Sequence, residues 1–257
     1  MYSLRGCNGS VIDILQSPNR QFVVAGGNDC KIHLWNAKTQ RHQRVYNGHT
    51  NKITSICISS DSKKLFSGSH DRTIRIWDIE SAACRYTISA HSGVNHLEIS
   101  PDEYYLATAH LDGNIRFFSW RDRKELFALK EHGKSQTNGI IFSPPDGYNI
   151  ITSSKDGKII LWDLRKQRKL NEINNKLFKN NTLTGYPIFS PDGKYIIAGS
   201  TLKDIKTGKY PIFIWNAKDL KFKYCLYEHK YGITNIVWDG RGGVASSDKG
   251  GNIMTWC

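Results

Sequence analysis

Residues 67–78 read SGSHDRTIRIWD, and this stretch defines a unit that recurs along the chain. Within it, Asp71 is followed six residues later by Trp77, and threonine and isoleucine alternate with other residues between them, as in a strand. Units of this kind end on an aromatic residue six times, at Trp35, Trp77, Phe118, Trp162, Trp215 and Trp256. The last two units lack an Asp six residues before the aromatic.

The intervals between these aromatic residues are 42, 41, 44, 53 and 41 residues. A period of about 40–45 residues with four short strands per unit is typical of a β-propeller. In the second unit we expect strands at 44–46, 53–58, 64–68 and 73–77, with turns between them. Because no stretch shows a long 3.6-residue apolar period, we expect almost no helix.

Three short motifs accompany the period. They are a Gly-His turn at 48–49, a Ser-Pro-Asp-Gly turn at 190–193, and Trp-Asp pairs at 77–78 and 162–163. With these motifs the chain resembles WD40-repeat proteins along its whole length. The resemblance predicts an all-β WD40 β-propeller with six visible four-stranded repeats, in a single domain that spans residues 1–257.

In WD40 blades a His, a Ser or Thr, an Asp and a Trp form a buried hydrogen-bonded chain, called here the blade tetrad. The resemblance therefore implies tetrads of His49, Ser67, Asp71 and Trp77, of His91, Thr108 and Asp112 with Phe118, and of His132, Thr152, Asp156 and Trp162. Phe118 lacks the indole N–H, so its tetrad has one donor fewer. Because these sets recur whereas a catalytic constellation occurs once, we predict no catalytic residues and no enzyme activity.

Three repeats depart from the pattern. The first has Cys7 at the position of the turn His and Ala25 at that of the Ser. The fifth lacks the Gly-His turn and carries an insertion, Thr201–Tyr210, between its inner strands. In the sixth, Gly250 stands at the Asp position and Asp248 lies two residues earlier.

These departures are similar to those of the C-terminal WD40 propeller of the autophagy-related protein 16 family. The likeness rests on residues 3–8 (SLRGCN), 67–73, 189–193 and 248–250. It implies a scaffold that recruits the ubiquitin-like lipidation complex to membranes through bound partners. That family has seven blades, and its helix and coiled coil lie upstream of them. The first repeat here matches the family's second, so the likeness favours a seven-bladed geometry with one blade missing. The alternative is a six-bladed ring, in which Tyr2–Leu4 supplies the outer strand of the last blade.

A partner is expected on the face formed by the turns that precede the innermost strands and the turns that hold the Asp residues. By position, this face presents Asn28, Lys52, Thr54, His70, Asn95, Leu111, Lys134, Asn138, Lys155, Tyr231, Thr234 and Lys249. The autophagy-related family uses an aromatic and a Lys for recruitment at the positions of Leu111 and Lys134. Lys134 preserves the charge, whereas Leu111 lacks the ring.

The opposite face is predicted to be basic. The hairpins after the aromatic residues carry Lys38, Arg41, Arg44, Arg121, Arg123, Lys124, Arg165, Lys166, Arg168, Lys169, Lys218, Lys221 and Lys223. With a formal net charge of +13, this face could contact an anionic membrane or RNA. The alternative function is therefore a WD40 subunit of an RNA-associated or ubiquitin-ligase complex. Alternatively, the basic residues of these hairpins bind no partner and only keep the protein soluble.

The six cysteines show no CxxC spacing, so we expect reduced thiols and no metal site. No cofactor and no small-molecule substrate are expected; the expected partners are proteins or peptides in a multiprotein complex. No apolar run is long enough to span a bilayer, and the first ten residues lack a signal-peptide core. These features predict a cytoplasmic protein, and the resemblance to the autophagy-related protein 16 family implies its recruitment to membranes.

Overall fold

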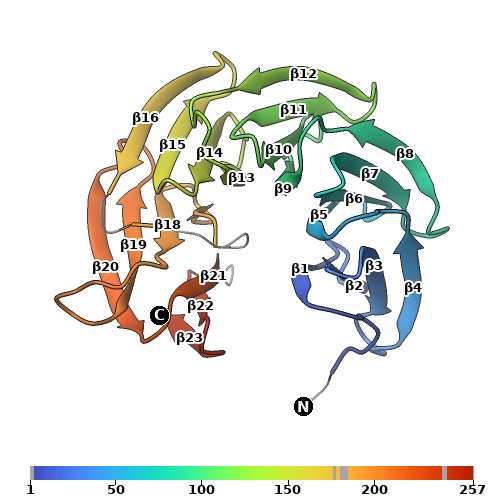
Figure 1. The fold of residues 1–257 in the computed structure, drawn as a ribbon, viewed down its shortest axis with the longest axis horizontal. Helices are drawn as coiled ribbons and strands as arrows, with labels where there is room; N and C mark the ends of the chain where they lie inside the picture. Colours follow the sequence, from blue (N-terminus) through green and yellow to red (C-terminus); the bar gives the residue numbers. More distant parts are fainter. Residues whose placement is uncertain (1–2, 176–177, 180–184, 239–241, 257) are drawn as a thin grey trace. The chain divides into compact units, whose positions relative to one another are not determined.

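The computed structural model describes residues 3–175, 178–179, 185–238 and 242–256. The chain divides into two compact units, residues 1–128 and 129–257. Each unit contains three antiparallel sheets that follow one another in chain order (Figure 1). A single domain over 1–257 stays a prediction.

The first unit holds three four-stranded sheets. Their strands are β1 (Val11–Gln16), β2 (Phe22–Gly27), β3 (Lys31–Asn36), β4 (His42–Asn47), β5 (Ile53–Ile58), β6 (Lys64–Ser69), β7 (Thr73–Asp78), β8 (Cys84–Ser89), β9 (Val94–Ile99), β10 (Leu106–His110), β11 (Ile115–Ser119) and β12 (Lys124–Leu129).

The second unit holds two four-stranded sheets and one of three strands. Their strands are β13 (Thr137–Phe142), β14 (Asn149–Ser154), β15 (Lys158–Asp163), β16 (Arg168–Asn174), β17 (Ile188–Phe189), β18 (Tyr195–Gly199), β19 (Tyr210–Asn216), β20 (Phe222–His229), β21 (Ile233–Trp238), β22 (Val244–Asp248) and β23 (Ile253–Trp256). As expected, no helix occurs among the described residues, and hence none that is long and apolar enough to cross a membrane.

Each sheet is a meander of consecutive hairpins, and the second shows why. β6 pairs with β7 in a register that places Leu65 opposite Trp77. The turn between them passes through Arg72 with a φ of 66°, a left-handed conformation that tightens the hairpin. Apolar side chains on both faces of the inner strands are buried, because each sheet packs against its neighbour within the unit.

Two details differ from the expected repeats. The sixth sheet has three described strands instead of four, and β23 forms its edge. Ser3 and Leu4 do not form an outer strand; Tyr2 lies outside the described residues. The chain after Leu4 is held by the first sheet instead, since Trp35 Nε1 donates to the Arg5 carbonyl over 3.0 Å.

The insertion of the fifth repeat lies where it was expected, between β18 and β19. A turn around Asp204 organises it, and its carboxylate accepts the Lys206 amide over 3.0 Å. Trp215 of this sheet has no tetrad among the described residues. Phe178 and Phe213 pack against its ring instead, with centroids 5.8 and 5.4 Å away.

Candidate functional site

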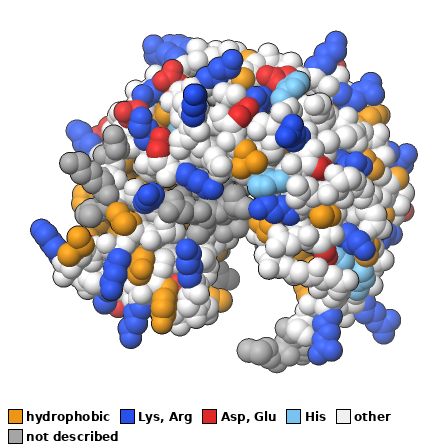
Figure 2. All heavy atoms as spheres, in the orientation of Figure 1, with side chains coloured by type: hydrophobic (Ala, Val, Ile, Leu, Met, Phe, Trp, Pro, Cys, Tyr) orange, Lys and Arg blue, Asp and Glu red, His pale blue; other side chains and the backbone are white. Residues whose placement is uncertain are grey.

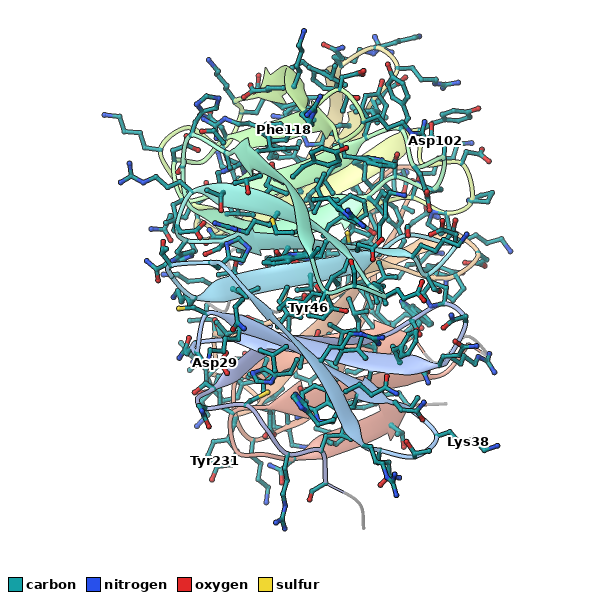
Figure 3. The ribbon with its side chains drawn as sticks, turned by 90° about the vertical axis from the view of Figure 1, so that its right-hand side faces the viewer. Asp29, Lys38, Tyr46, Asp102, Phe118 and Tyr231 are labelled. Carbon is teal, nitrogen blue, oxygen red and sulfur yellow. The ribbon has the colours of Figure 1, made fainter. Side chains whose placement is uncertain are left out.

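Each sheet brings two of its turns to one end of its strands, called here the turn edge. A backbone hydrogen bond joins these turns in most sheets: the amide before the Asp position donates to the turn that precedes the innermost strand. The pairs are Asn28 to Ser10, His70 to Lys52, Leu111 to Gly93, Lys155 to Gln136 and Lys249 to Gly232, with lengths of 2.9–3.2 Å. Asp29 lies at this end of β3 and Lys38 at the other (Figure 3).

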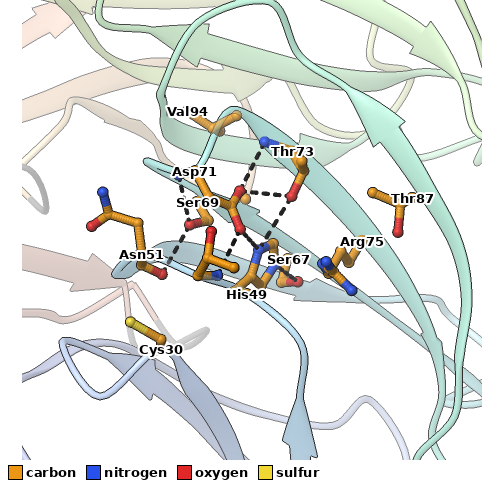
Figure 4. A network of polar contacts seen from close by, with 12 residues as sticks. Cys30, His49, Asn51, Ser67, Ser69, Asp71, Thr73, Arg75, Thr87 and Val94 are labelled. Carbon is orange, nitrogen blue, oxygen red and sulfur yellow. Dashed lines mark hydrogen bonds and ion pairs between the residues drawn. The ribbon is translucent and has the colours of Figure 1, made fainter.

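The second sheet contains the expected tetrad, of which Figure 4 shows His49, Ser67 and Asp71. His49 Nδ1 lies 2.7 Å from Asp71 Oδ2, and His49 Nε2 lies 2.7 Å from Ser67 Oγ. Trp77 Nε1 donates to the same Ser67 oxygen over 2.8 Å. Although the order Ser–His–Asp matches that of a hydrolase triad, Ser67 is fully buried and accepts the indole N–H. Its hydroxyl is therefore not presented to a substrate.

The sixth sheet contains a complete tetrad that the sequence motifs did not predict. His229 Nδ1 lies 2.9 Å from Asp248 Oδ2, His229 Nε2 lies 2.7 Å from Ser246 Oγ, and Trp256 Nε1 donates to Ser246 over 2.8 Å. Asp248 replaces the turn Asp because it lies on β22 two residues after Ser246, so both side chains point to one face. The spacing of histidine and tryptophan indicates this tetrad, because His229 stands 27 residues before Trp256 and His49 stands 28 residues before Trp77.

In the third sheet the expected role of His91 is wrong. Its side chain is exposed and lies 3.5 Å from Glu125. The buried His110 takes its place, with Nε2 2.7 Å from Thr108 Oγ1, because it lies on the same face of β10. Asp112 binds Arg116 over 2.6 Å instead of a histidine, and its pKa is lowered to about 2, mainly by hydrogen bonding to Arg116 against the opposing effect of burial.

In the fourth sheet, His132 Nε2 lies 2.8 Å from Thr152 Oγ1, which also accepts the Trp162 indole N–H over 2.8 Å. The expected contact with Asp156 is absent from the described residues. The Asp156 carboxylate binds Ser154 and the Lys158 amide within its own turn. His132 Nδ1 is consequently buried with no hydrogen-bond partner among the described residues.

The buried His132 ring, whose Nδ1 has no hydrogen-bond partner among the described residues, predicts that the stability of the chain decreases at acid pH. Burial lowers the pKa of His132 from 6.5 to about 4. His132 is therefore protonated below about pH 6.5 in the unfolded chain but only below about pH 4 in the folded chain. Because the unfolded chain binds the proton more readily, the free energy of unfolding falls as the pH is lowered from about 6.5 to about 4. We expect His132→Gln to reduce the loss between pH 7 and 4 by about 2–3 kcal/mol, measured by urea unfolding. The exposed His91→Gln should leave the wild-type pH profile unchanged; equal profiles for all three proteins would contradict the assignment.

The first sheet has no tetrad of the usual kind. Asp29 Oδ2 lies 2.8 Å from His33 Nε2, and His33 Nδ1 lies 3.2 Å from His42 Nε2. Cys7 stands beside this pair, where other repeats have the turn His. Burial raises the pKa of its thiol, and the negative charge of Asp29 raises it further.

Nine of the twelve residues expected to meet a partner are at least partly exposed on the turn edge. They are Asn28, Lys52, His70, Leu111, Lys134, Lys155, Tyr231, Thr234 and Lys249. The other three are corrected, because Thr54, Asn95 and Asn138 are buried at 0–2% exposure. They hold the strands instead: Thr54 Oγ1 donates to the Val94 carbonyl, Asn95 Oδ1 lies 3.0 Å from His70 Nε2, and Asn138 accepts the Ser153 hydroxyl.

A groove of about 470 Å³ lies on the turn edge of the first unit, called here the turn groove. Its lining is Asn51, His70, Arg72, His91, Ser92, Gly93, Leu111 and Asp112. Of these, only His70 and Leu111 were expected to bind a partner. Arg72 is exposed and forms no ion pair with the part of the chain that the structure describes. The groove thus combines an unpaired cation, two imidazoles and one apolar side chain.

The hairpins at the opposite ends of the strands carry the expected basic residues. Several lie over aromatic rings at 4.6–5.0 Å: Arg121 over Trp120, Arg123 over Tyr86 and Arg165 over Tyr148. Figure 2 views the first unit from the other side, that of its turn edge and Asp29, and there too lysine and arginine side chains outnumber acidic ones.

Recurrent four-stranded sheets with Trp-centred tetrads define the class of WD-repeat β-propellers. The family model described as "WD domain, G-beta repeat" matches residues 1–36, 40–78, 82–119 and 123–163, so the chain belongs to this family. Propellers of this family are generally protein-interaction scaffolds.

Among known proteins, the chain is similar to "Protein tipD" of Dictyostelium discoideum, with 28% identity over 99% of this chain and 41% of that protein. It is also similar to "Autophagy-related protein 16" of Arabidopsis thaliana, with 27% identity over 99% of this chain and 48% of that protein. "Pre-mRNA-processing factor 19 homolog 2" of the same plant is 24% identical over 92% of this chain and 43% of that protein. The chain thus spans less than half the length of each.

Proposed function

We propose that this chain is a non-catalytic cytoplasmic scaffold of the autophagy-related type. It takes part in recruiting a ubiquitin-like lipidation complex to membranes by binding a protein or peptide in the turn groove. The observation that carries the proposal is the turn groove itself, taken with the similarity over nearly the whole chain to an autophagy-related protein.

The lining of the groove favours an acidic peptide with one apolar residue. Arg72 offers an exposed guanidinium that forms no ion pair with the described residues, and guanidinium groups bind carboxylates in a bidentate manner. Asp112 does not repel such a peptide strongly, because Arg116 neutralises it at 2.6 Å. Leu111 is partly exposed beside them and gives an apolar contact.

The test is affinity capture from cell extract with the full chain, followed by protein identification. We expect wild type to retain proteins of the lipidation or vesicle-acidification machinery. Arg72→Glu combined with His70→Ala should lower that retention at least tenfold, since central interface residues contribute about 2 kcal/mol or more. Arg121→Glu, on the opposite hairpins, is the matched control and should retain them.

Two results would overturn this proposal. One is a set of captured proteins with no member of those machineries. The other is equal capture by wild type and the groove variant, which would place binding elsewhere.

The second candidate is a subunit of an RNA-associated complex. It is favoured by the basic hairpins and by the similarity to a pre-mRNA-processing factor. If it is right, single-stranded RNA should bind the chain with an affinity that falls steeply with salt, because each neutralised phosphate releases counterions. Reversing Arg121, Arg123 and Lys124 to Glu should weaken binding and reduce the salt slope by about 2–3. No binding at low salt removes this candidate.

A further inference from the structure

The first sheet gathers three metal-ligating side chains at its turn edge. The Cys7 sulfur, an Asp29 carboxylate oxygen and a His33 ring nitrogen all lie within 4.8 Å of one another. Ligand atoms around a tetrahedral zinc ion are roughly 3.3–3.8 Å apart, given bond lengths of about 2.0–2.3 Å. The three atoms therefore need to shift by only about 1 Å to surround an ion.

The loop that carries Cys7 is fixed from both sides. Before Cys7, Trp35 Nε1 donates to the Arg5 carbonyl over 3.0 Å. After it, the Asn8 amide donates to Asp29 over 3.1 Å. Gly6, with a φ of 137°, lies against the His42 ring, where an added Cβ would stand 3.3 Å from Cδ2. These contacts hold the loop that carries Cys7 against the first sheet, next to Asp29.

His42 orients the histidine of this cluster from behind. Its Nε2 lies 3.2 Å from His33 Nδ1 and can accept a hydrogen bond from the Nδ1–H group. Without an ion, His33 Nε2 donates to Asp29 Oδ2 over 2.8 Å; a bound ion would displace that proton, and the hydrogen bond from Nδ1–H to His42 would hold the ring in the tautomer that can bind it. Histidines that bind metals almost always donate their other ring N–H in this way.

We propose that Cys7, Asp29 and His33 form a zinc site, in which the ion replaces the polar chain of a blade tetrad and fastens the N-terminal loop to the first sheet. The donor set favours Zn²⁺, because thiolate with imidazole suits this ion and the carboxylate completes three protein ligands. The fourth position is open to water or to a side chain of a partner. The expectation that no metal binds rested on the missing CxxC pattern, whereas these ligands come from a loop, a turn and a strand.

The proposal is tested by titrating the chelator-treated full chain with Zn²⁺ and, separately, with Co²⁺. We expect one ion per chain and a thiolate-to-cobalt charge-transfer band. Cys7→Ser should abolish the band and weaken zinc binding more than about tenfold, and His42→Ala should weaken it about 10–100-fold. Cys30→Ser is the matched control, because this thiol lies on the same turn as Asp29 but outside the cluster, where it donates to the Asn28 carbonyl over 3.7 Å.

A second measurement needs no variant. Bound zinc should slow alkylation of Cys7 by iodoacetamide in the wild-type chain, as read by peptide mapping, while the exposed Cys84 stays reactive. No zinc binding by wild type, a cobalt band that survives Cys7→Ser, or equal alkylation of Cys7 with and without zinc would each overturn the site.

Discussion

Trp77→Ala should lower the free energy of unfolding by about 3–5 kcal/mol, the usual result of removing a large buried ring. The Trp77 side chain is 1% exposed and packs between the second sheet and its neighbour. Its loss also deprives Ser67 of a hydrogen-bond donor inside the core. For a chain of this size we expect the Tm to fall by about 10 °C or more, measured by circular dichroism.

Trp77→Phe separates packing from hydrogen bonding. Phenylalanine keeps most of the ring but lacks the N–H, as Phe118 does in the third sheet. We expect a loss of about 1 kcal/mol, the contribution of a typical buried hydrogen bond. Melting of Trp77→Ala near the wild-type temperature would show that the tetrad of the second sheet does not support the fold.

Asp248→Ala should destabilise the chain by a similar amount, about 3–5 kcal/mol, because it leaves a buried partner uncompensated. Both His229 and Asp248 have fully buried side chains, and Asp248 also accepts the backbone amides of Gly250 and Asn252 over 2.9 and 3.1 Å. Hydrogen bonding to His229, set against burial, holds the pKa of Asp248 below its usual range, so the carboxylate is charged at neutral pH. Urea unfolding of the variant measures the effect.

The control for this prediction is Asp156→Ala. By position Asp156 is the better match to the WD40 motif, yet it contacts Ser154 and Lys158 in its own turn and not His132. We expect a loss of only about 1 kcal/mol, as for a local turn or cap. If Asp156→Ala proves as severe as Asp248→Ala, the fourth tetrad is closed and the assignment of the orphaned His132 is wrong.

The fold was predictable because its signals are local and periodic. The spacing of Asp71 and Trp77 recurs, and each repeat folds into a meander whose strands are adjacent in sequence. Local hairpins need no information from distant segments, so the pattern alone predicts them. The second tetrad was predictable for the same reason, since all four of its members stand at their usual offsets.

The candidate site was less predictable. Exposure on the turn edge depends on how neighbouring sheets pack, which is why Asn95 and Asn138 are buried although their positions suggested a binding face. The sequence did not predict Arg72 as a binding residue, because it does not show which arginines remain without an ion pair in the folded chain.

By itself, the sequence determined the all-β class, the six repeats and the family, through periodic residues whose effect is local. Only the tertiary structure decided which side chains meet. It pairs His229 with Asp248 and Thr108 with His110, turns Asp156 away from His132, and gathers Cys7, Asp29 and His33. The physical reason is that a hydrogen bond or a metal site forms only where two side chains are placed to within a few tenths of an ångström, and the packing of strands and loops sets that placement. Asp248 lies two residues away from the usual Asp position, so the motif does not reveal it. In the strand, however, side chains two residues apart point to the same face, and Asp248 therefore lies on the same face as Ser246.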